Sequence, residues 1–174
     1  EIGSYATSYI PTYSVSATRA QDTCNKLDAS GEINSTEGVL YAEIAAFSGA
    51  NTDRQISISD GGTSNRVVMA LLSNGTQIQF VVASGGSITV NATNTIPTIT
   101  SGTKIAFAYK ENDFKIYANG ILIASDISGA VPTGLDALRF DRGDGNDKFY
   151  GKVNEVQVYT EALTDAELAT LTTI

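Results

Sequence analysis

The densest group of charged side chains in the sequence lies at residues 141–148, which read Asp-Arg-Gly-Asp-Gly-Asn-Asp-Lys. Carboxylate and amide oxygens are the ligands that calcium prefers in proteins, and glycines allow the tight bends that such loops need. Asp141, Asp144 and Asp147 are therefore candidate calcium ligands. The alternative is a turn between two strands, in which Asp and Asn side chains accept hydrogen bonds from their own backbone.

Two familiar loop motifs do not fit this stretch. An EF-hand loop needs oxygen ligands at its first, third and fifth positions. Counting from Asp141 puts glycines at the third and fifth positions, and counting from Asp144 puts Lys148 at the fifth. The Arg-Gly-Asp tripeptide at 142–144 is a feature of integrin ligands, but three residues recur too easily by chance to carry that interpretation.

The sequence contains no histidine and a single cysteine, Cys24. Serine and cysteine nucleophiles usually depend on a histidine base, and zinc sites depend on cysteine and histidine ligands, so these chemistries are excluded. Cys24 is predicted to be a buried or inert thiol and not a nucleophile. Oxygen-ligated ions such as calcium or magnesium are the metals that remain open.

Carboxylate catalysis is the remaining enzymatic option. Glycosidases place two acids at one scissile bond. The alternating stretches around Glu43 and Glu155 each contain a single acid, so the sequence predicts that the protein is not an enzyme. That prediction would be reversed if Glu43 and Glu155 faced each other across an open cleft.

Composition and charge set further bounds. A chain of 174 residues, 42% of them hydrophobic, is large enough for one domain with a single core. Its formal net charge of −8 argues against nucleic acid or an anionic membrane as the main partner. No apolar run approaches the roughly 20 residues that span a bilayer, so membrane insertion is not expected. The start at Glu1 suggests a fragment of a longer protein.

Short alternating stretches rich in Val, Ile, Thr and Ser predict an all-β fold. About ten strands at this spacing are typical of a two-sheet antiparallel jelly-roll sandwich. The expected turns carry Gly or Asn and lie at 60–62, 74–75, 85–86, 111–113 and 119–120.

One short helix is predicted at the C-terminus. Thr164 would be its N-cap, and Glu167, three residues on, would complete a capping box. Leu163, Leu168 and Leu171 would face the sandwich.

The C-terminal part of the sequence resembles the closing strand and helix of the LamG-like, concanavalin A-like jelly-roll family. Members of that family often end with an aromatic residue and a glycine, a hydrophobic strand that contains an acid, a tyrosine, and an Ala-Leu-Ser/Thr-Asp-Ala-Glu helix start. The hairpin at 114–126 is also similar. The matching C-terminal positions are Tyr150, Gly151, Val153, Asn154, Glu155, Val156, Val158, Tyr159, 162–167 and Leu168.

The opening stretch, EIGSYATSYIPT with the later TRAQD, resembles a junction in tailed-bacteriophage fibre and other virion surface proteins. This resemblance implies a junction segment at 1–17 and a jelly-roll domain at 18–174. It also implies a module on a virion surface or otherwise extracellular, or a carbohydrate-binding module of a bacterial surface protein. Many such fibres are trimers, so a homotrimer formed through the parent protein is a further implication.

Residues suited to sugar binding flank two of the predicted turns. Sugar sites combine an aromatic face with polar side chains that bind hydroxyl groups. The chain has no tryptophan, and Tyr150, beside the charged stretch, is the best aromatic candidate. The polar candidates would form a groove if the two turns met at one edge of the sandwich; they are Arg54, Asn65, Arg66, Arg142 and Asn146.

The other tyrosines are assigned to packing. Those inside alternating strands are predicted to lie in the core; they are Tyr41, Tyr109, Tyr117 and Tyr159. Tyr5, Tyr9 and Tyr13 recur every four residues, but Pro11 disfavours a helix there. They are predicted to form an interface with a neighbouring domain or subunit.

Together these features predict a non-catalytic binding module for cell-surface glycans, with calcium as the one cofactor left open. The alternative is a structural or decoration domain of a virion. Such a domain would contact neighbouring virion subunits through the three N-terminal tyrosines, and its loops would bind nothing.

Overall fold

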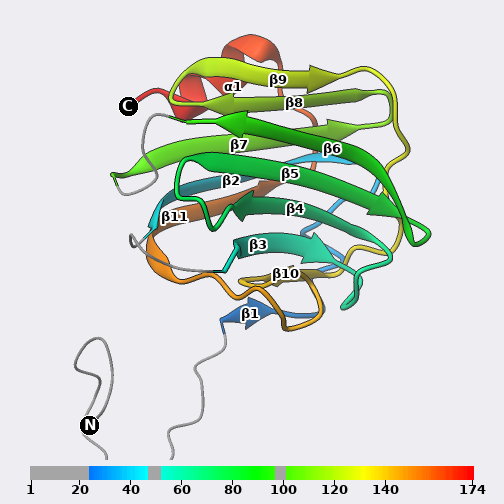
Figure 1. Ribbon diagram of the computed structural model, residues 1–174. Coiled ribbons are helices and arrows are strands. Elements are labelled where there is room, and N and C mark those ends of the chain that lie inside the picture. The colour runs from blue at the N-terminus through cyan, green and yellow to red at the C-terminus, as the bar shows by residue number, and fades with distance from the viewer. Residues whose placement is uncertain (1–23, 47–51, 97–100) are drawn as a thin grey trace, which may run out of the picture.

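The structure is a computed structural model that describes residues 24–46, 52–96 and 101–174. Over these residues the chain forms a sandwich of two antiparallel sheets with one short helix (Figure 1). The predicted all-β, two-sheet fold with a C-terminal helix is confirmed. The predicted boundary between residues 17 and 18 lies outside the described residues.

The first sheet, sheet A, has six strands in the described part of the chain. Their order is β1-β10-β3-β4-β5-β6, and every neighbouring pair is antiparallel. In that order the strands are Asn25–Lys26, Ala137–Arg139, Arg54–Ser59, Arg66–Leu71, Gln77–Ser84 and Ser87–Thr95.

The second sheet, sheet B, has five strands over the same described ranges, in the order β11-β2-β7-β8-β9. The strands are Gly151–Tyr159, Glu37–Ala46, Thr103–Lys110, Asp113–Ala118 and Ile121–Asp126. The turns fall where the sequence places them. Gly61, Gly75, Gly85, Asn112 and Gly120 all have positive φ angles at these positions.

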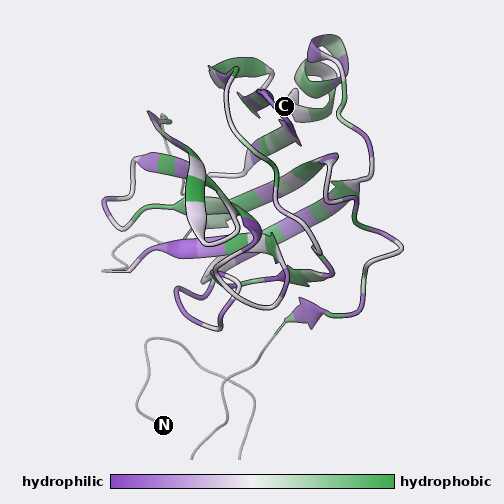
Figure 2. Ribbon diagram, turned by 90° about the vertical axis from the view of Figure 1, so that its right-hand side faces the viewer, coloured by the Kyte–Doolittle hydropathy of each residue, from purple (hydrophilic) through white to green (hydrophobic). Residues whose placement is uncertain are grey.

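The core lies between the two sheets, and strand alternation decides which side chains enter it. In β2, Leu40, Ala42 and Ile44 point into the main core, whereas Val39 and Tyr41 belong to a second cluster on the opposite face. Hydrophobic and hydrophilic residues alternate along the strands accordingly (Figure 2).

Helix α1 (Asp165–Thr172) covers part of the outer face of sheet B. Leu168 is fully buried there against Tyr41 and Tyr117, with Leu163 and Leu171 packed around it. Tyr159 packs against the same cluster, and Tyr109 lies in the main core. The predicted packing of the helix leucines and of the four strand tyrosines is therefore confirmed. None of the described helices is long and apolar enough to cross a bilayer.

The N-terminus of α1 is held by the predicted capping box. The backbone N–H of Glu167 donates to Thr164 Oγ1 (3.4 Å), and the backbone N–H of Thr164 donates to Glu167 Oε2 (2.8 Å). Replacing Thr164 with Ala is expected to lower the free energy of unfolding by about 1 kcal/mol, because the hydroxyl group that accepts from Glu167 N–H and donates to the Glu167 carboxylate is lost. Urea denaturation would measure this, with Thr170→Ala, inside the same helix, as the control. An equal cost for both variants would contradict a capping role.

Candidate functional site

Residues 140–149, referred to below as the charged loop, leave strand β10 and return toward β11. Phe149 N–H donates to the carbonyl oxygen of Phe140 (2.9 Å), and the two rings pack edge to face with centroids 6.4 Å apart. The ends of the loop are thereby closed by backbone and aromatic contacts. The loop lies at the lower edge of the sandwich in Figure 1, beside β10 and β3.

Asp141 organises the first half of the charged loop. Its carboxylate accepts the backbone N–H groups of Gly143 (2.7 Å) and Gly145 (3.3 Å), and the residue is 5% exposed. Gly143, Gly145 and Asp147 adopt positive φ angles of 110°, 87° and 49°. The loop is therefore a tight turn held by its own carboxylate, as in the hydrogen-bonded alternative that the sequence left open.

Arg142 organises the second half. Its Nε and Nη2 donate to the two carboxylate oxygens of Asp144 (3.2 and 2.7 Å), and its Nη1 donates to Asp147 Oδ2 (3.2 Å). The Asn146 amide also donates to Asp144 (3.0 Å). The bond from Arg142, with help from Asn146, holds the pKa of Asp144 well below its usual range, and the pKa of Arg142 is raised.

The three carboxylates predicted as calcium ligands are engaged in these contacts. A calcium ion would have to displace the guanidinium of Arg142 from Asp144 and Asp147 and the glycine N–H groups from Asp141. Within the described ranges, no group of three or more acidic or cysteine side chains is placed to hold a metal ion. As arranged, these residues do not fit a calcium ion, and calcium binding stays a prediction.

The charged loop lies on the outer face of sheet A. Ser57 Oγ donates to the carbonyl of Asp141 (2.8 Å), and Arg66 Nη1 donates to the carbonyl of Arg142 (3.2 Å). The backbone N–H of Gln55 donates to the carbonyl of Asp147 (3.1 Å). Ser57 is 0% exposed as a result, although it points away from the core.

The turn at 60–65 meets the charged loop over the same face. Asp60 accepts the N–H of Gly62 (3.0 Å) and the Asn65 amide (2.9 Å). Gly143 packs so closely that a Cβ atom built on it would lie 2.6 Å from the carbonyl oxygen of Gly62. The two turns therefore converge, which is the geometry that the sequence required for a groove. Their surface side chains are called the polar rim below; they are Asn65, Arg66, Arg142, Asp144 and Asn146.

Not every predicted binding residue joins the polar rim. Arg54 is 1% exposed and has no surface from which to contact a ligand. Tyr150 is 45% exposed and follows the charged loop directly. Tyr5, Tyr9 and Tyr13 lie outside the described residues. Of the two alternatives predicted for Cys24, burial is wrong: the residue is exposed, because the short strand β1 that it precedes lies at the edge of sheet A.

Sequence reasoning missed the anchors of the charged loop, Gln55 and Ser57. Both alternate with buried isoleucines along β3. That alternation predicts a polar outer face. It does not indicate that a loop about 85 residues away covers this face, a separation that follows from the Ser57–Asp141 contact.

Glu43 and Glu155 are direct neighbours on adjacent strands of sheet B. Glu43 accepts a hydrogen bond from the Asn154 amide (2.8 Å), and Gln157 donates to Glu155. They share the outer face with Tyr41, side by side within one sheet and not on two walls of a cleft. The condition that would have reversed the non-enzyme prediction is therefore not met.

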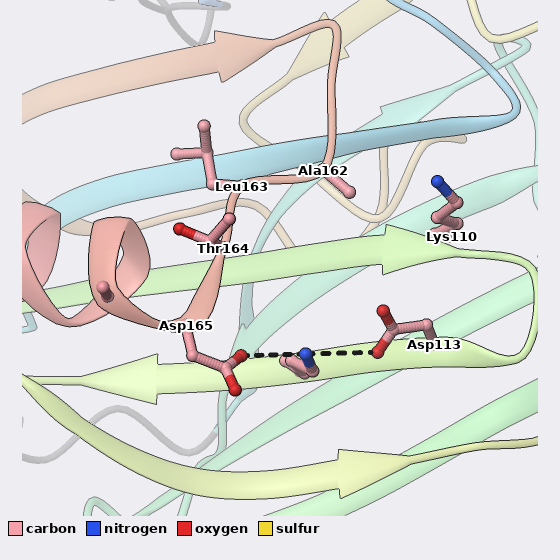
Figure 3. A pocket seen from close by; sticks show the side chains of 8 residues that line it. Lys110, Asp113, Ala162, Leu163, Thr164 and Asp165 are labelled. Atoms are coloured by element: carbon pink, nitrogen blue, oxygen red, sulfur yellow. Dashed lines mark ion pairs between the residues drawn. The ribbon is translucent and has the colours of Figure 1, made fainter.

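A shallow groove of about 500 Å³ lies where β7 and β8 meet the start of α1 (Figure 3). Its charges are already paired. Lys115 contacts Asp165 (2.8 Å) and Asp113 (3.5 Å), and Lys110 contacts Glu37 (3.0 Å). The groove lies beside sheet B, away from the two turns that converge over sheet A.

The ion pair of Asp144 makes stability depend on pH. Because the folded-state pKa of Asp144 is lowered, its contribution is present above the ordinary Asp pKa of about 4 and is lost as the pH falls below it. As the pH is lowered from about 5 to 2.5, we expect the free energy of unfolding to fall less for the Asp144→Asn variant than for the unmodified protein. Urea denaturation across this range would measure both. Parallel pH profiles would contradict the assignment.

Comparison with known proteins gives one family and a set of solved structures. The Laminin_G_3 profile, described as the concanavalin A-like lectin/glucanases superfamily, matches residues 40–169. No curated protein sequence matches significantly.

The solved structures share the fold at low sequence identity. The CBM40 module of the Ruminococcus gnavus IT-sialidase, bound to alpha2,3 sialyllactose, superposes with a TM-score of 0.66 and 19% identity, over 80% of this chain and 84% of that one. Bacillus licheniformis beta-glucanase superposes with a TM-score of 0.55 and 15% identity, over 72% of this chain and 67% of that one. Sheep galectin-11 in complex with glycerol superposes with a TM-score of 0.53 and 10% identity, over 80% of this chain and 99% of that one.

Proposed function

Because the chain belongs to the concanavalin A-like lectin/glucanases superfamily, we propose that it is a non-catalytic glycan-binding module that binds at the polar rim. The observation that carries the proposal is the convergence of the turn at 60–65 and the charged loop over sheet A. The structures that share this fold include a carbohydrate-binding module solved with a bound glycan, which supports the same function.

The polar rim offers the groups that sugar hydroxyls require. The Asn146 side chain supplies its carbonyl oxygen as an acceptor and its second N–H as a donor, because its other N–H donates to Asp144. The Asp144 carboxylate already accepts four hydrogen bonds from Arg142 and Asn146, so its role is to hold that amide in place. Arg142 holds Asp144 in place through two hydrogen bonds, so these groups are ordered before a ligand arrives. The exposed ring of Tyr150 provides an apolar face for a sugar ring.

The non-catalytic part of the proposal follows from the acids. Glycosidases need one carboxyl group as an acid and a second as a base or nucleophile. The two groups must flank the glycosidic bond that is cleaved. Glu43 and Glu155 are neighbours within the face of one sheet. The carboxylates of the charged loop are held by Arg142 and by backbone N–H groups.

The wider setting that we propose is a bacteriophage tail fibre or a similar virion surface protein that attaches to glycans of a bacterial host. The resemblance of residues 1–22 to a fibre junction supports it. A homotrimer of the parent protein would present three weak sites together, and avidity would then strengthen attachment. The alternative parent protein is a bacterial surface protein, in which the chain would be a carbohydrate-binding module that is also extracellular.

The test is glycan titration by calorimetry, followed by two matched variants. Asn146→Ala and Asn154→Ala each remove one amide–carboxylate hydrogen bond, the first at the polar rim and the second on sheet B. We expect Asn146→Ala to weaken binding about 5- to 30-fold, as expected for the loss of 1–2 kcal/mol, and Asn154→Ala to leave it unchanged. Equal effects would place the site elsewhere.

The structural or decoration role is the outcome if no glycan binds. The internal hydrogen bonds of the charged loop favour that alternative, since they satisfy most of its polar groups without a ligand. Absence of binding across neutral and acidic glycans at millimolar concentration would make it the better description.

A further inference from the structure

We propose that the polar rim selects neutral sugars and excludes sugars that carry a carboxylate; this inference rests on the glycan-binding function proposed above. Asp144 and Asp147 would be the residues that determine this specificity.

The positive charge of Arg142 is already paired with two carboxylates. A guanidinium binds a carboxylate best through two parallel N–H groups. In this structure the Nε–Nη2 edge donates to Asp144 and one N–H of Nη1 donates to Asp147, so three of the five N–H groups are used. A carboxylated sugar would have to displace Asp144 from that edge or approach a guanidinium whose charge two carboxylates already offset.

The other two arginines of the region are partly buried. Arg66 Nη1 donates to the carbonyl of Arg142. The Nε atoms of Arg66 and Arg139 are both buried, with no hydrogen-bond partner within the described part of the chain. A ligand at the surface cannot reach these two Nε atoms, so neither arginine can offer it an Nε–Nη edge.

The net charge points the same way. Residues 60–66 and 139–148 contain four basic and four acidic side chains, which cancel, while the whole chain carries a formal charge of −8. An anionic glycan is therefore repelled by the molecule at long range and gains no net attraction at the site. Neutral hydroxyl groups, by contrast, are suited to the amide of Asn146, which binds them without a positive charge.

The experiment titrates the protein with paired ligands, one neutral and the other carrying one or two carboxylates. The pairs are lactose with 3′-sialyllactose, N-acetyllactosamine with its 3′-sialylated form, and digalactose with digalacturonate. We expect the neutral member of at least one pair to bind 10-fold or more tightly than its acidic partner. Added salt should narrow this difference, because it screens the repulsion.

Two variants separate the release of Arg142 from a change in net charge. The double variant Asp144→Asn, Asp147→Asn removes two negative charges and frees the guanidinium of Arg142. Asp60→Asn removes one negative charge from the neighbouring turn, where Asp60 binds Gly62 and Asn65 and not Arg142. The double variant should gain affinity for the acidic ligands by 10-fold or more, and Asp60→Asn should change it by less than threefold. Circular dichroism would establish that both variants fold.

The outcomes distinguish the two proposals. Tighter binding of an acidic ligand by the unmodified protein would overturn the selectivity and leave the glycan-binding function standing. Equal gains in the double variant and in Asp60→Asn would overturn the role of Arg142. A protein that binds neither member of any pair would overturn both the function and the inference that rests on it.

Discussion

Replacing Gly143 with alanine is expected to lower the free energy of unfolding by about 2–4 kcal/mol and to abolish binding at the polar rim. Two penalties combine at this position. Its φ of 110° disfavours any residue with a Cβ atom. A Cβ there would also lie 2.6 Å from the carbonyl oxygen of Gly62 and 3.2 Å from Cβ of Ser59, so the charged loop would have to lift from the turn at 60–65.

Two other glycines serve as controls for Gly143→Ala. Gly145 also has a positive φ, but nothing lies within 4 Å of its added Cβ, so Gly145→Ala reports the backbone penalty alone. Gly31 has open space and no positive φ, so Gly31→Ala should be close to neutral. Urea denaturation would give the stability of each variant, and glycan titration would give its binding. A cost for Gly143→Ala no greater than that for Gly145→Ala would show that the contact with Gly62 is not needed.

Replacing Phe107 with alanine is expected to lower the free energy of unfolding by about 3–5 kcal/mol. This is a large share of the total, which is about 5–15 kcal/mol for most domains. Phe107 is 0% exposed on β7, and its ring packs edge to face against Phe80 on β5, with centroids 5.0 Å apart. The pair joins the two sheets at the centre of the core. Its removal leaves a cavity between layers that cannot close without moving both sheets.

Calorimetric and chemical unfolding of Phe107→Ala would measure this cost. Phe107→Leu, which keeps most of the volume, should cost clearly less. A cost below about 2 kcal/mol for the alanine variant would mean that neighbouring side chains collapse into the space. Glycan binding at a temperature where the variant remains folded should be unchanged, since Phe107 lies in the core and not on the polar rim.

The fold was predictable because its rules are local. Alternation in β2 separates Leu40 and Ala42 from Val39 and Tyr41, and the structure puts these pairs on opposite faces. The capping residues Thr164 and Glu167 start the helix where the sequence predicts it. Each of these signals is contained within a few consecutive residues.

The candidate site was predictable only in part, because it depends on contacts between distant segments. The residue types around 141–148 indicated a polar loop, and the Gly-rich turn at 60–62 indicated a second one. That the two turns meet is a property of the strand order, in which β10 pairs with β3. Burial of Arg54 and exposure of Cys24 likewise depend on strand placement, which residue type does not indicate.

The closure of the charged loop by Phe140 and Phe149 has a consequence for protein engineering. The loop is fixed at its two ends by this pair and is held down by Asp141 and Gly143, while Asp144 and Asn146 at its tip are exposed. Positions 144 and 146 can therefore be randomised without removing a side chain from the core, provided that Gly145 is kept for its positive φ of 87°. The domain would then serve as a display scaffold, in which new binding specificities are selected at the tip while the sandwich beneath stays the same.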